Sequence, residues 1–422
     1  MDKSQHPCKK SYLSTLAFYM ISIMTSPKNS SFPLMLLFLL VVIFYLNFVA
    51  RVVLAPLLPV VEKELNLSHG QAGSLFFFIA AGYGIGLLSS GFVSAFLNHR
   101  RTITLSIMMV GVAMLAVSRA TSITGIHGAL MLAGISAGFY LPSGIAVITE
   151  SVRKEHWGKA MAIHELAPNL GFITSPLLSE IFLRFLSWRG GLALVGVVSI
   201  LMGVFFLFFG RGGKQKGESP SFKSIRQIAQ NSSFWIMTVL FIVSIGSSLG
   251  LYTMMPLFLV NEIGMDRGWA NTLIGLSRVF GIVVLFISGM ITDRVGPKNA
   301  MTLFLATTGV FTFLFGFLRG ALITPILLFF QAASTACLFP VGFTVMALIF
   351  PSHLRSIGVS LVIFIGFIIG GGMIPTSIGY CAEAFSFSSG FSLLGIFFLA
   401  LLPLFVRIGN RLEVSGEKEK SH

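Results

Sequence analysis

Charged residues and cysteines are both scarce in this sequence. Only 10% of the 422 residues are charged and 55% are hydrophobic, and the mean hydropathy is +0.89. So little polar surface cannot cover a water-soluble globule, which excludes that class of protein. The three cysteines, Cys8, Cys337 and Cys381, are too few and too far apart for a disulfide framework or a metal site. We expect them to be small packing residues.

Motifs of catalysis and of nucleotide binding are absent as well. The sequence contains no histidine cluster with metal-ligand spacing and no phosphate-binding loop. We therefore expect neither an enzyme nor a bound cofactor or metal. Acidic residues number 15 against 29 lysines and arginines, which gives a net charge of +14. Because the basic residues are scattered over short loops, they do not indicate a nucleic-acid partner.

Long apolar stretches are what the sequence does contain. Each runs for roughly 20 residues or more, enough for a helix to cross ~30 Å of hydrocarbon. Lipid favours helices because every backbone polar group must be bonded internally. We therefore predict an all-α integral membrane protein. Its twelve predicted spans are 34–60, 70–96, 102–118, 125–150, 157–184, 189–210, 233–260, 268–292, 298–318, 321–350, 354–381 and 387–408.

The basic residues divide unevenly between the two sides of this topology. Twenty-one of the 29 lie in the tails and even-numbered loops or at the span ends beside them, six lie in or beside the odd-numbered loops, and Arg51 and Arg278 lie deep inside spans. By the positive-inside rule, both termini are predicted to be cytoplasmic. The compact loops suggest a multi-pass protein of a bacterial inner (plasma) membrane.

The spans and polar stretches predict five segments. These are a cytoplasmic N-terminal tail (1–32), a six-helix half (33–210), a cytoplasmic linker (211–232), a second six-helix half (233–408) and a cytoplasmic C-terminal tail (409–422). The apolar run 12–24 is too short to span, and the residues after it lack a clear cleavage site. We interpret it as an interfacial or disordered tail, or as an extension upstream of a start at Met24. Residues 221–230 predict a short amphipathic helix on the membrane surface, or a plain basic linker.

The two halves carry an internal repeat between their second and third spans. The complete copy, Gly289 to Lys298, contains Gly289, Asp293, Arg294, Gly296 and Lys298. The degenerate copy retains Gly91, Arg100 and Arg101 but has Ala95 and Phe96 in place of the charged pair. The complete copy resembles the signature G-x-x-x-D-R-x-G-x-[RK] of the major facilitator superfamily (MFS). The resemblance extends over residues 33–410.

The resemblance implies two pseudo-symmetric six-helix halves that rock about a midplane site. In this family the signature acts on conformation rather than on chemistry. Its glycines let helices pack closely, and its aspartate caps a helix of the other half. Asp293 is therefore expected near Trp157 and Gly158, where it would latch the cytoplasmic side in the outward-open state. Ala95 cannot form the equivalent latch. The alternative is that Asp293 and Arg294 form a solvated loop pair.

Arg51 and Arg278 are the candidate substrate-binding residues. Both lie at similar depth, ~13 Å from the outer helix ends, where a charge normally faces a cavity or a partner. The planar guanidinium suits a carboxylate or phosphate, so two of them predict a site for an anion. The surroundings of Arg51 resemble the first span of anion:cation symporters and organophosphate antiporters, and those of Arg278 resemble the eighth span of monocarboxylate and oxalate-type carriers. The alternatives are that Arg51 snorkels to the outer interface and that Arg278 pairs with Glu262 or Glu383.

Glu165 and His164 form the candidate site for proton coupling or gating. A buried carboxyl beside a histidine can carry a coupling proton. The preferred interpretation is that Glu165 joins a cytoplasmic gate with Asp293, Arg294 or Arg153. Further possible cavity-lining groups are Tyr45, Asn47, Tyr83, Tyr140, Asn169, Tyr252, Gln331 and Tyr380.

These features predict a secondary active transporter that moves a small organic anion, such as a carboxylate or a sugar acid, by alternating access. Because no ATP-binding motif is present, uphill transport would draw on a gradient, and the expected coupling ion is H+. The expected partners are the anionic substrate and the lipid bilayer, and the expected state is a monomer. The alternatives are an exporter of drugs or metabolites, including siderophore-like compounds, and a transport-inactive permease-like sensor.

Overall fold

The computed structural model describes residues 34–217, 222–318, 320, 322–350 and 352–406, and all regular structure in this part is helical. Both predicted tails, with Cys8, lie outside it. The first half consists of α2 (Leu34–Val52), α3 (Leu54–Leu65), α4 (His69–Leu97), α5 (His99–Arg119), α6 (Ile123–Gly138), α7 (Tyr140–Ser151), the 3₁₀ turn η1 (Lys154–His156), α8 (Trp157–His164), α9 (Leu166–Phe185) and α10 (Trp188–Phe209).

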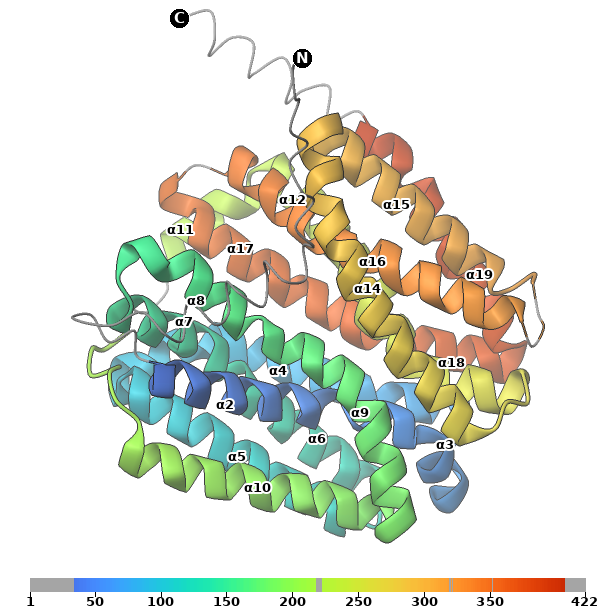
Figure 1. Ribbon diagram of the computed structural model, residues 1–422, viewed down its shortest axis with the longest axis horizontal. Coiled ribbons are helices and arrows are strands. Elements are labelled where there is room, and N and C mark those ends of the chain that lie inside the picture. Colours follow the sequence, from blue (N-terminus) through green and yellow to red (C-terminus); the bar gives the residue numbers. More distant parts are fainter. Residues whose placement is uncertain (1–33, 218–221, 319, 321, 351, 407–422) are drawn as a thin grey trace, which may run out of the picture.

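The linker contains α11 (Phe222–Ala229), so the predicted linker helix is present. The second half consists of α12 (Ser232–Ile245), the π-helical segment η2 (Gly246–Gly250), α13 (Leu251–Leu257), the π-helical segment η3 (Phe258–Glu262), α14 (Arg267–Val295), α15 (Pro297–Leu314), α16 (Ile323–Ile349), α17 (Ser352–Gly366), the π-helical segment η4 (Phe367–Met373), α18 (Ile374–Ala384) and α19 (Phe387–Ala400). In Figure 1 the blue-to-green helices of the first half lie below the yellow-to-red helices of the second.

Eleven helical segments of the described residues are long and apolar enough to cross a membrane. The remaining predicted span corresponds to α15, which has 18 residues. Its first turn, Pro297-Lys298-Asn299, lowers its mean hydropathy. α15 nevertheless packs against α16 and α19 like the other helices of its half. The predicted all-α membrane fold is confirmed.

Three predicted spans are broken, each three residues before a proline. The breaks lie at Val53, Phe139 and Glu165, ahead of Pro56, Pro142 and Pro168. Proline has no N–H for the carbonyl four residues earlier and its ring crowds that carbonyl, so the helix bends or restarts there. The first, fourth and fifth spans therefore each contain a local interruption, at which the backbone stays in the helical region and which the hydropathy pattern does not predict.

The two halves meet along a few helix pairs. α4 packs against α17, η4 and α18, α9 packs against α14, and α3 packs against α13. We call the end of the bundle where α10 ends and α12 begins the linker face, and the end where α3 ends and α4 begins the opposite face.

The contacts between the halves are tight at the opposite face. A Cβ atom on Gly73 would lie 2.6 Å from the Pro375 carbonyl oxygen, so α4 and α18 touch through their backbones. Arg267 donates two hydrogen bonds to Glu180 across the interface, both of 3.0 Å. Toward the linker face, Gly158 and Gly289 have open space where a Cβ atom would stand. The structure is therefore closed at the opposite face.

The repeat between the second and third spans is preserved in the backbone. Gly296 ends α14 with φ 81° and ψ 154°, and Asn98 ends α4 with φ 75° and ψ 163°. Glycine, and to a lesser degree asparagine, tolerates positive φ. The degenerate copy has lost the charged pair of the signature but keeps its turn.

The linker segment that follows α10 packs on this degenerate copy. The backbone N–H of Arg100 donates to the Gly213 carbonyl at 2.9 Å, and the N–H of Gly213 donates to the Glu150 carboxylate at 2.9 Å. The N–H of Gly217 donates to the Ser94 carbonyl at 3.2 Å. These hydrogen bonds thus attach the linker to the degenerate copy, in which the charged pair of the signature is missing.

Candidate functional site

Arg51 lies in the last turn of α2, midway along the first span. Its side chain is only 5% exposed. The guanidinium carbon lies 4.0 Å from the centre of the Tyr83 ring and 4.9 Å from that of the Phe48 ring. It also lies 5.6 Å from the Phe367 ring, which belongs to the opposite half. A cation over aromatic faces is attracted by their quadrupoles, so the rings hold the charge in the interior.

Arg278 lies within α14 and has a matching environment. Its guanidinium carbon is 4.9 Å from the Tyr252 ring of its own half and 4.8 Å from the Phe172 ring of the other half. One terminal nitrogen donates to the Ser248 carbonyl at 3.0 Å, and the Tyr252 hydroxyl donates to the Phe172 carbonyl at 3.3 Å. Each arginine is thus held between a tyrosine of its own half and a phenylalanine of the other.

A pair of phenylalanines lies between the two arginines. Phe48, beside Arg51, meets Phe172, beside Arg278, edge to face at 4.7 Å between ring centres. The structure therefore brings both arginines to the interface of the halves, as the sequence predicts, but with rings between them. A single anion clamped by both guanidinium groups would require these rings to move.

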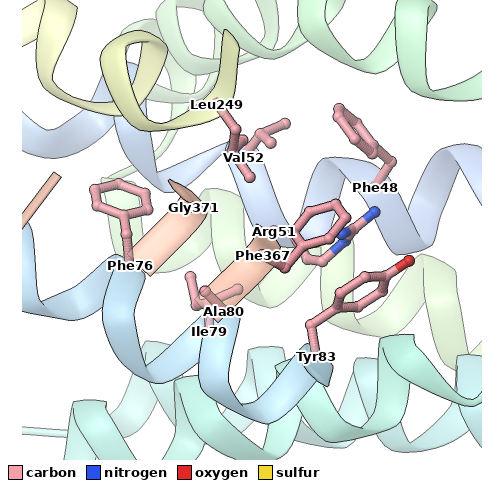
Figure 2. A pocket seen from close by; sticks show the side chains of 10 residues that line it. All are labelled: Phe48, Arg51, Val52, Phe76, Ile79, Ala80, Tyr83, Leu249, Phe367 and Gly371. Atoms are coloured by element: carbon pink, nitrogen blue, oxygen red, sulfur yellow. The ribbon is translucent and has the colours of Figure 1, made fainter. Parts of the chain in front are cut away.

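The space beside Arg51 is small and mostly apolar. It is lined by Phe48, Arg51, Val52, Phe76, Ile79, Ala80, Tyr83, Leu249, Phe367 and Gly371, and Figure 2 shows the guanidinium among the rings. Its cavity volume of about 10 Å³ is roughly what one water molecule needs. α2, α4, η2 and η4 all contribute to it, so both halves shape this site.

Neither arginine has a compensating carboxylate among the described residues. In the part of the chain that the structure describes, no ion pair involves Arg51 or Arg278, and the Nε atom of each is buried without a hydrogen-bond partner. Glu262 instead accepts hydrogen bonds from Ser388. Glu383 accepts one from the Gly70 N–H. The predicted alternatives, snorkelling of Arg51 and an ion pair of Arg278 with Glu262 or Glu383, are therefore not what the structure contains.

His164 and Glu165 lie at the break between α8 and α9. The His164 ring is fully buried and stacks on Phe44 at 4.5 Å. The Tyr140 hydroxyl donates to the Leu40 carbonyl at 2.7 Å, so it accepts from His164 Nε2 at 3.0 Å. That network assigns the proton of a neutral ring to Nε2 and leaves Nδ1 as an acceptor without a partner.

The Glu165 carboxylate is the nearest charge to that free nitrogen. Its Oε1 lies 3.6 Å from His164 Nδ1, and the side chain is 59% exposed. The free ring nitrogen therefore lies beside a carboxylate that solvent reaches. Within the described chain, no ion pair joins Glu165 to Arg153 or Arg294. In this structure, which is closed at the opposite face, Glu165 does not make the predicted gate contacts.

The signature residues lie at the linker face. Asp293 and Arg294 are exposed at the end of α14, and Gly289 and Gly296 flank them. No described hydrogen bond joins Asp293 to Trp157 or Gly158, and the Trp157 indole donates to the Val152 carbonyl instead. The expected latch belongs to the opposite conformation, so it stays a prediction. In the degenerate copy, Arg100 donates to the Leu207 carbonyl at 2.7 Å, and the Arg101 N–H donates to Asn98 at 3.0 Å.

Sequence reasoning found the charged groups of the site but not the rings around them. Tyr83 and Tyr252 are among the predicted cavity-lining residues and do lie beside the arginines. Phe48, Phe172 and Phe367 were not singled out, because 42 phenylalanines give no signal that separates these three. Gln331, another candidate, donates to the Ser247 carbonyl at 3.0 Å inside the second half. Cys337 is buried in the apolar core, in agreement with its predicted packing role.

Comparison with known proteins supports this architecture. The cis,cis-muconate transport protein of Acinetobacter baylyi is 22% identical over 379 residues, which cover 82% of this chain and 88% of that protein. Multidrug resistance protein 2 of Bacillus subtilis is 22% identical over 298 residues, which cover 66% and 73% of the two chains. The structure of a bacterial homolog of the human lysosomal transporter Spinster, inward-facing and unoccupied, matches 92% of this chain and 99% of that one, with a TM-score of 0.74 and 15% identity.

The family profile described as Major Facilitator Superfamily matches residues 36–329. That range covers most of the chain and includes the first half, the linker, the complete signature and both arginines. The relatives and the structural neighbour named above are membrane transporters, and the helical architecture agrees with theirs. The chain therefore belongs to the Major Facilitator Superfamily and is a membrane transporter, not an enzyme.

Proposed function

We propose that the protein carries a small organic anion across the membrane by alternating access, with Arg51 and Arg278 as its substrate-binding residues. The observation that carries the proposal is a pair of guanidinium groups at the interface of the halves with no carboxylate beside them. A buried charge without a partner is costly. A substrate carboxylate would supply the missing counter-charge and accept from the free donors.

The muconate transport protein favours the same substrate class, because muconate is a dicarboxylate and the match covers most of both chains. In this proposal the halves 33–210 and 233–408 rock about the arginines, and 211–232 links them. The excess of basic residues at the linker face supports placing that face, with both termini, in the cytoplasm of a bacterial inner membrane. The working unit is a monomer, since both halves of one chain shape the site.

Proton coupling is assigned to His164 and Glu165. His164 Nδ1 is a buried acceptor without a partner, and Glu165 joins it to solvent. Protonation there would place a positive ring beside the carboxylate, and deprotonation would remove that attraction. The pair lies at the interruption of the fifth span. In this proposal, a change in the charge of the pair changes the bend of that span.

The test is uptake of labelled carboxylates into proteoliposomes that contain the purified full-length protein, with and without an inward proton gradient. Arg51→Lys keeps the charge and loses the planar fork, whereas Arg51→Ala and Arg278→Ala remove the charge. We expect anion uptake that the gradient accelerates, weaker uptake with the lysine variant, and none with the alanine variants.

The rival functions give different results in the same assay. An exporter of amphipathic drugs, as the multidrug resistance relative would suggest, would move hydrophobic cations and keep that activity in both alanine variants. A transport-inactive sensor would move none of the compounds. Either result would overturn the proposal.

A further inference from the structure

The walls around Arg51 contain very few groups that could bind a hydroxyl. Of the ten lining residues, only Arg51 and Tyr83 have polar side-chain atoms, and the remainder are aliphatic, phenylalanine or glycine. Figure 2 shows rings on several sides of the guanidinium. The charged group can bind a carboxylate, but the surface next to it is mainly apolar and aromatic.

Three hydroxyls near the site residues in sequence are already bonded within their own helices. Ser247, Ser277 and Thr253 are fully buried. They donate to the carbonyls of Ser244, Ile274 and Gly250 in their own helices, at 3.2, 2.8 and 2.8 Å. The Tyr252 hydroxyl donates to the Phe172 carbonyl. Asn47 Oδ1, next to Phe48 in the chain, is a buried acceptor without a partner. A polyhydroxylated substrate would still bury most of its hydroxyls without partners, which is unfavourable.

The rings also favour a particular shape of substrate. Tyr83 and Phe367 lie 4.7 Å apart between ring centres, and Phe48 and Phe172 continue the aromatic surface toward Arg278. Flat π-systems gain from stacked or edge contacts with such rings beyond their buried area. A flexible saturated chain gains only the free energy of burying its apolar area, and it loses conformational freedom on binding.

We infer that the site selects carboxylates with a flat, unsaturated or aromatic body and few hydroxyl groups, and that it discriminates against sugar acids. This rests on the proposed function, since it assumes that Arg51 binds the carboxylate. It narrows the substrate class that the sequence leaves open between simple carboxylates and sugar acids. The discrimination comes from the side chains of α2, α4 and η4 and not from the charge.

Binding to the purified full-length protein tests the inference with acids of one length. Sorbate, hexanoate and gluconate each have six carbons and one carboxylate, and they differ in conjugation and hydroxyls. Muconate, adipate and galactarate repeat the comparison with two carboxylates. We expect sorbate and muconate to bind tightest, the saturated acids a few-fold more weakly, and gluconate and galactarate at least about tenfold more weakly than the saturated acids.

Variants separate the effect of the rings from the effect of the missing hydroxyl partners. Phe367→Leu keeps the wall apolar but removes a ring, so the sorbate-to-hexanoate ratio should fall toward one while gluconate stays poor. Phe48→Leu gives the same test from the other half if the first variant does not fold. Phe391→Leu removes a ring that is fully buried elsewhere, and it should leave both ratios unchanged.

The possible outcomes test the selectivity for flat carboxylates and the proposed anion transport separately. Gluconate or galactarate binding as tightly as sorbate or muconate would overturn the inference and leave the anion carrier standing. Equal ratios in the wild type, Phe367→Leu and Phe48→Leu would overturn the role of the rings. If none of the six acids binds and none is transported, the proposed function fails and the inference fails with it.

Discussion

Replacing Arg51 by methionine should stabilise the protein and at the same time weaken anion binding at least about tenfold. Methionine approximates the length of the arginine stem and carries no charge. The guanidinium is 5% exposed and lies over three rings at 4.0, 4.9 and 5.6 Å. These contacts contribute about 1–3 kcal/mol together. Desolvation of an unpaired buried ion costs several kcal/mol. The cost exceeds the gain, so Arg51→Met should unfold a few degrees higher in a detergent melting experiment.

Arg267 provides the matched control, because its guanidinium is paired. It donates two 3.0 Å hydrogen bonds to Glu180, and both side chains are partly exposed. Arg267→Met leaves Glu180 without its ion pair, so it should lower the free energy of unfolding by about 1 kcal/mol. The two substitutions are chemically identical and should shift the melting temperature in opposite directions.

The binding measurement completes this prediction. A charged group contributes about 1.5–3 kcal/mol for each hydrogen bond to a carboxylate, which corresponds to at least about a tenfold loss of affinity in Arg51→Met. The reasoning is refuted if Arg51→Met lowers the melting temperature as much as Arg267→Met does, because Arg51 would then be a structural residue. It is equally refuted if the variant binds anions with unchanged affinity.

Three further predictions concern the conformational cycle. Asp293→Ala should slow transport without changing anion affinity, whereas Arg101→Ala in the degenerate copy should have little effect; normal transport by Asp293→Ala at wild-type abundance would disprove the latch. Glu180→Gln should weaken closure of the opposite face, so a single cysteine at Val260 should react several-fold faster with an impermeant thiol reagent; an unchanged rate would mean that the ion pair does not hold that face. His164→Gln should retain anion exchange in counterflow but lose acceleration by a proton gradient; gradient-driven uptake at the wild-type rate would assign the proton elsewhere.

Much of the fold was predictable because lipid imposes strict requirements on sequence. A helix must present about 20 apolar residues to cross the membrane, so hydropathy locates the spans. It does not locate the breaks at Val53, Phe139 and Glu165, since a proline bends some helices and leaves others continuous. Pro340 lies within the unbroken α16. The surrounding packing decides which outcome occurs.

The candidate site divides in the same way. A charge inside a span is rare enough to stand out in the sequence, so Arg51 and Arg278 were identified directly. The sequence does not show whether these arginines have carboxylate partners, because Glu262 and Glu383 lie in the same half as Arg278. Only the tertiary structure shows that the two carboxylates accept hydrogen bonds from Ser388 and Gly70 instead. The role of Asn98 is a similar case. Its positive φ reveals the repeated turn where the signature residues themselves are lost.

The sequence by itself determined that this protein is an integral membrane protein, that it is built from two related halves, and that two charges lie within its spans. Each of those properties is a matter of composition or spacing along the chain. Only the tertiary structure decided that each arginine is held by a ring from the opposite half, and that no carboxylate of the described residues pairs with it. The physical reason is that contacts between the halves join residues far apart in the chain, and their geometry depends on how all the helices pack together.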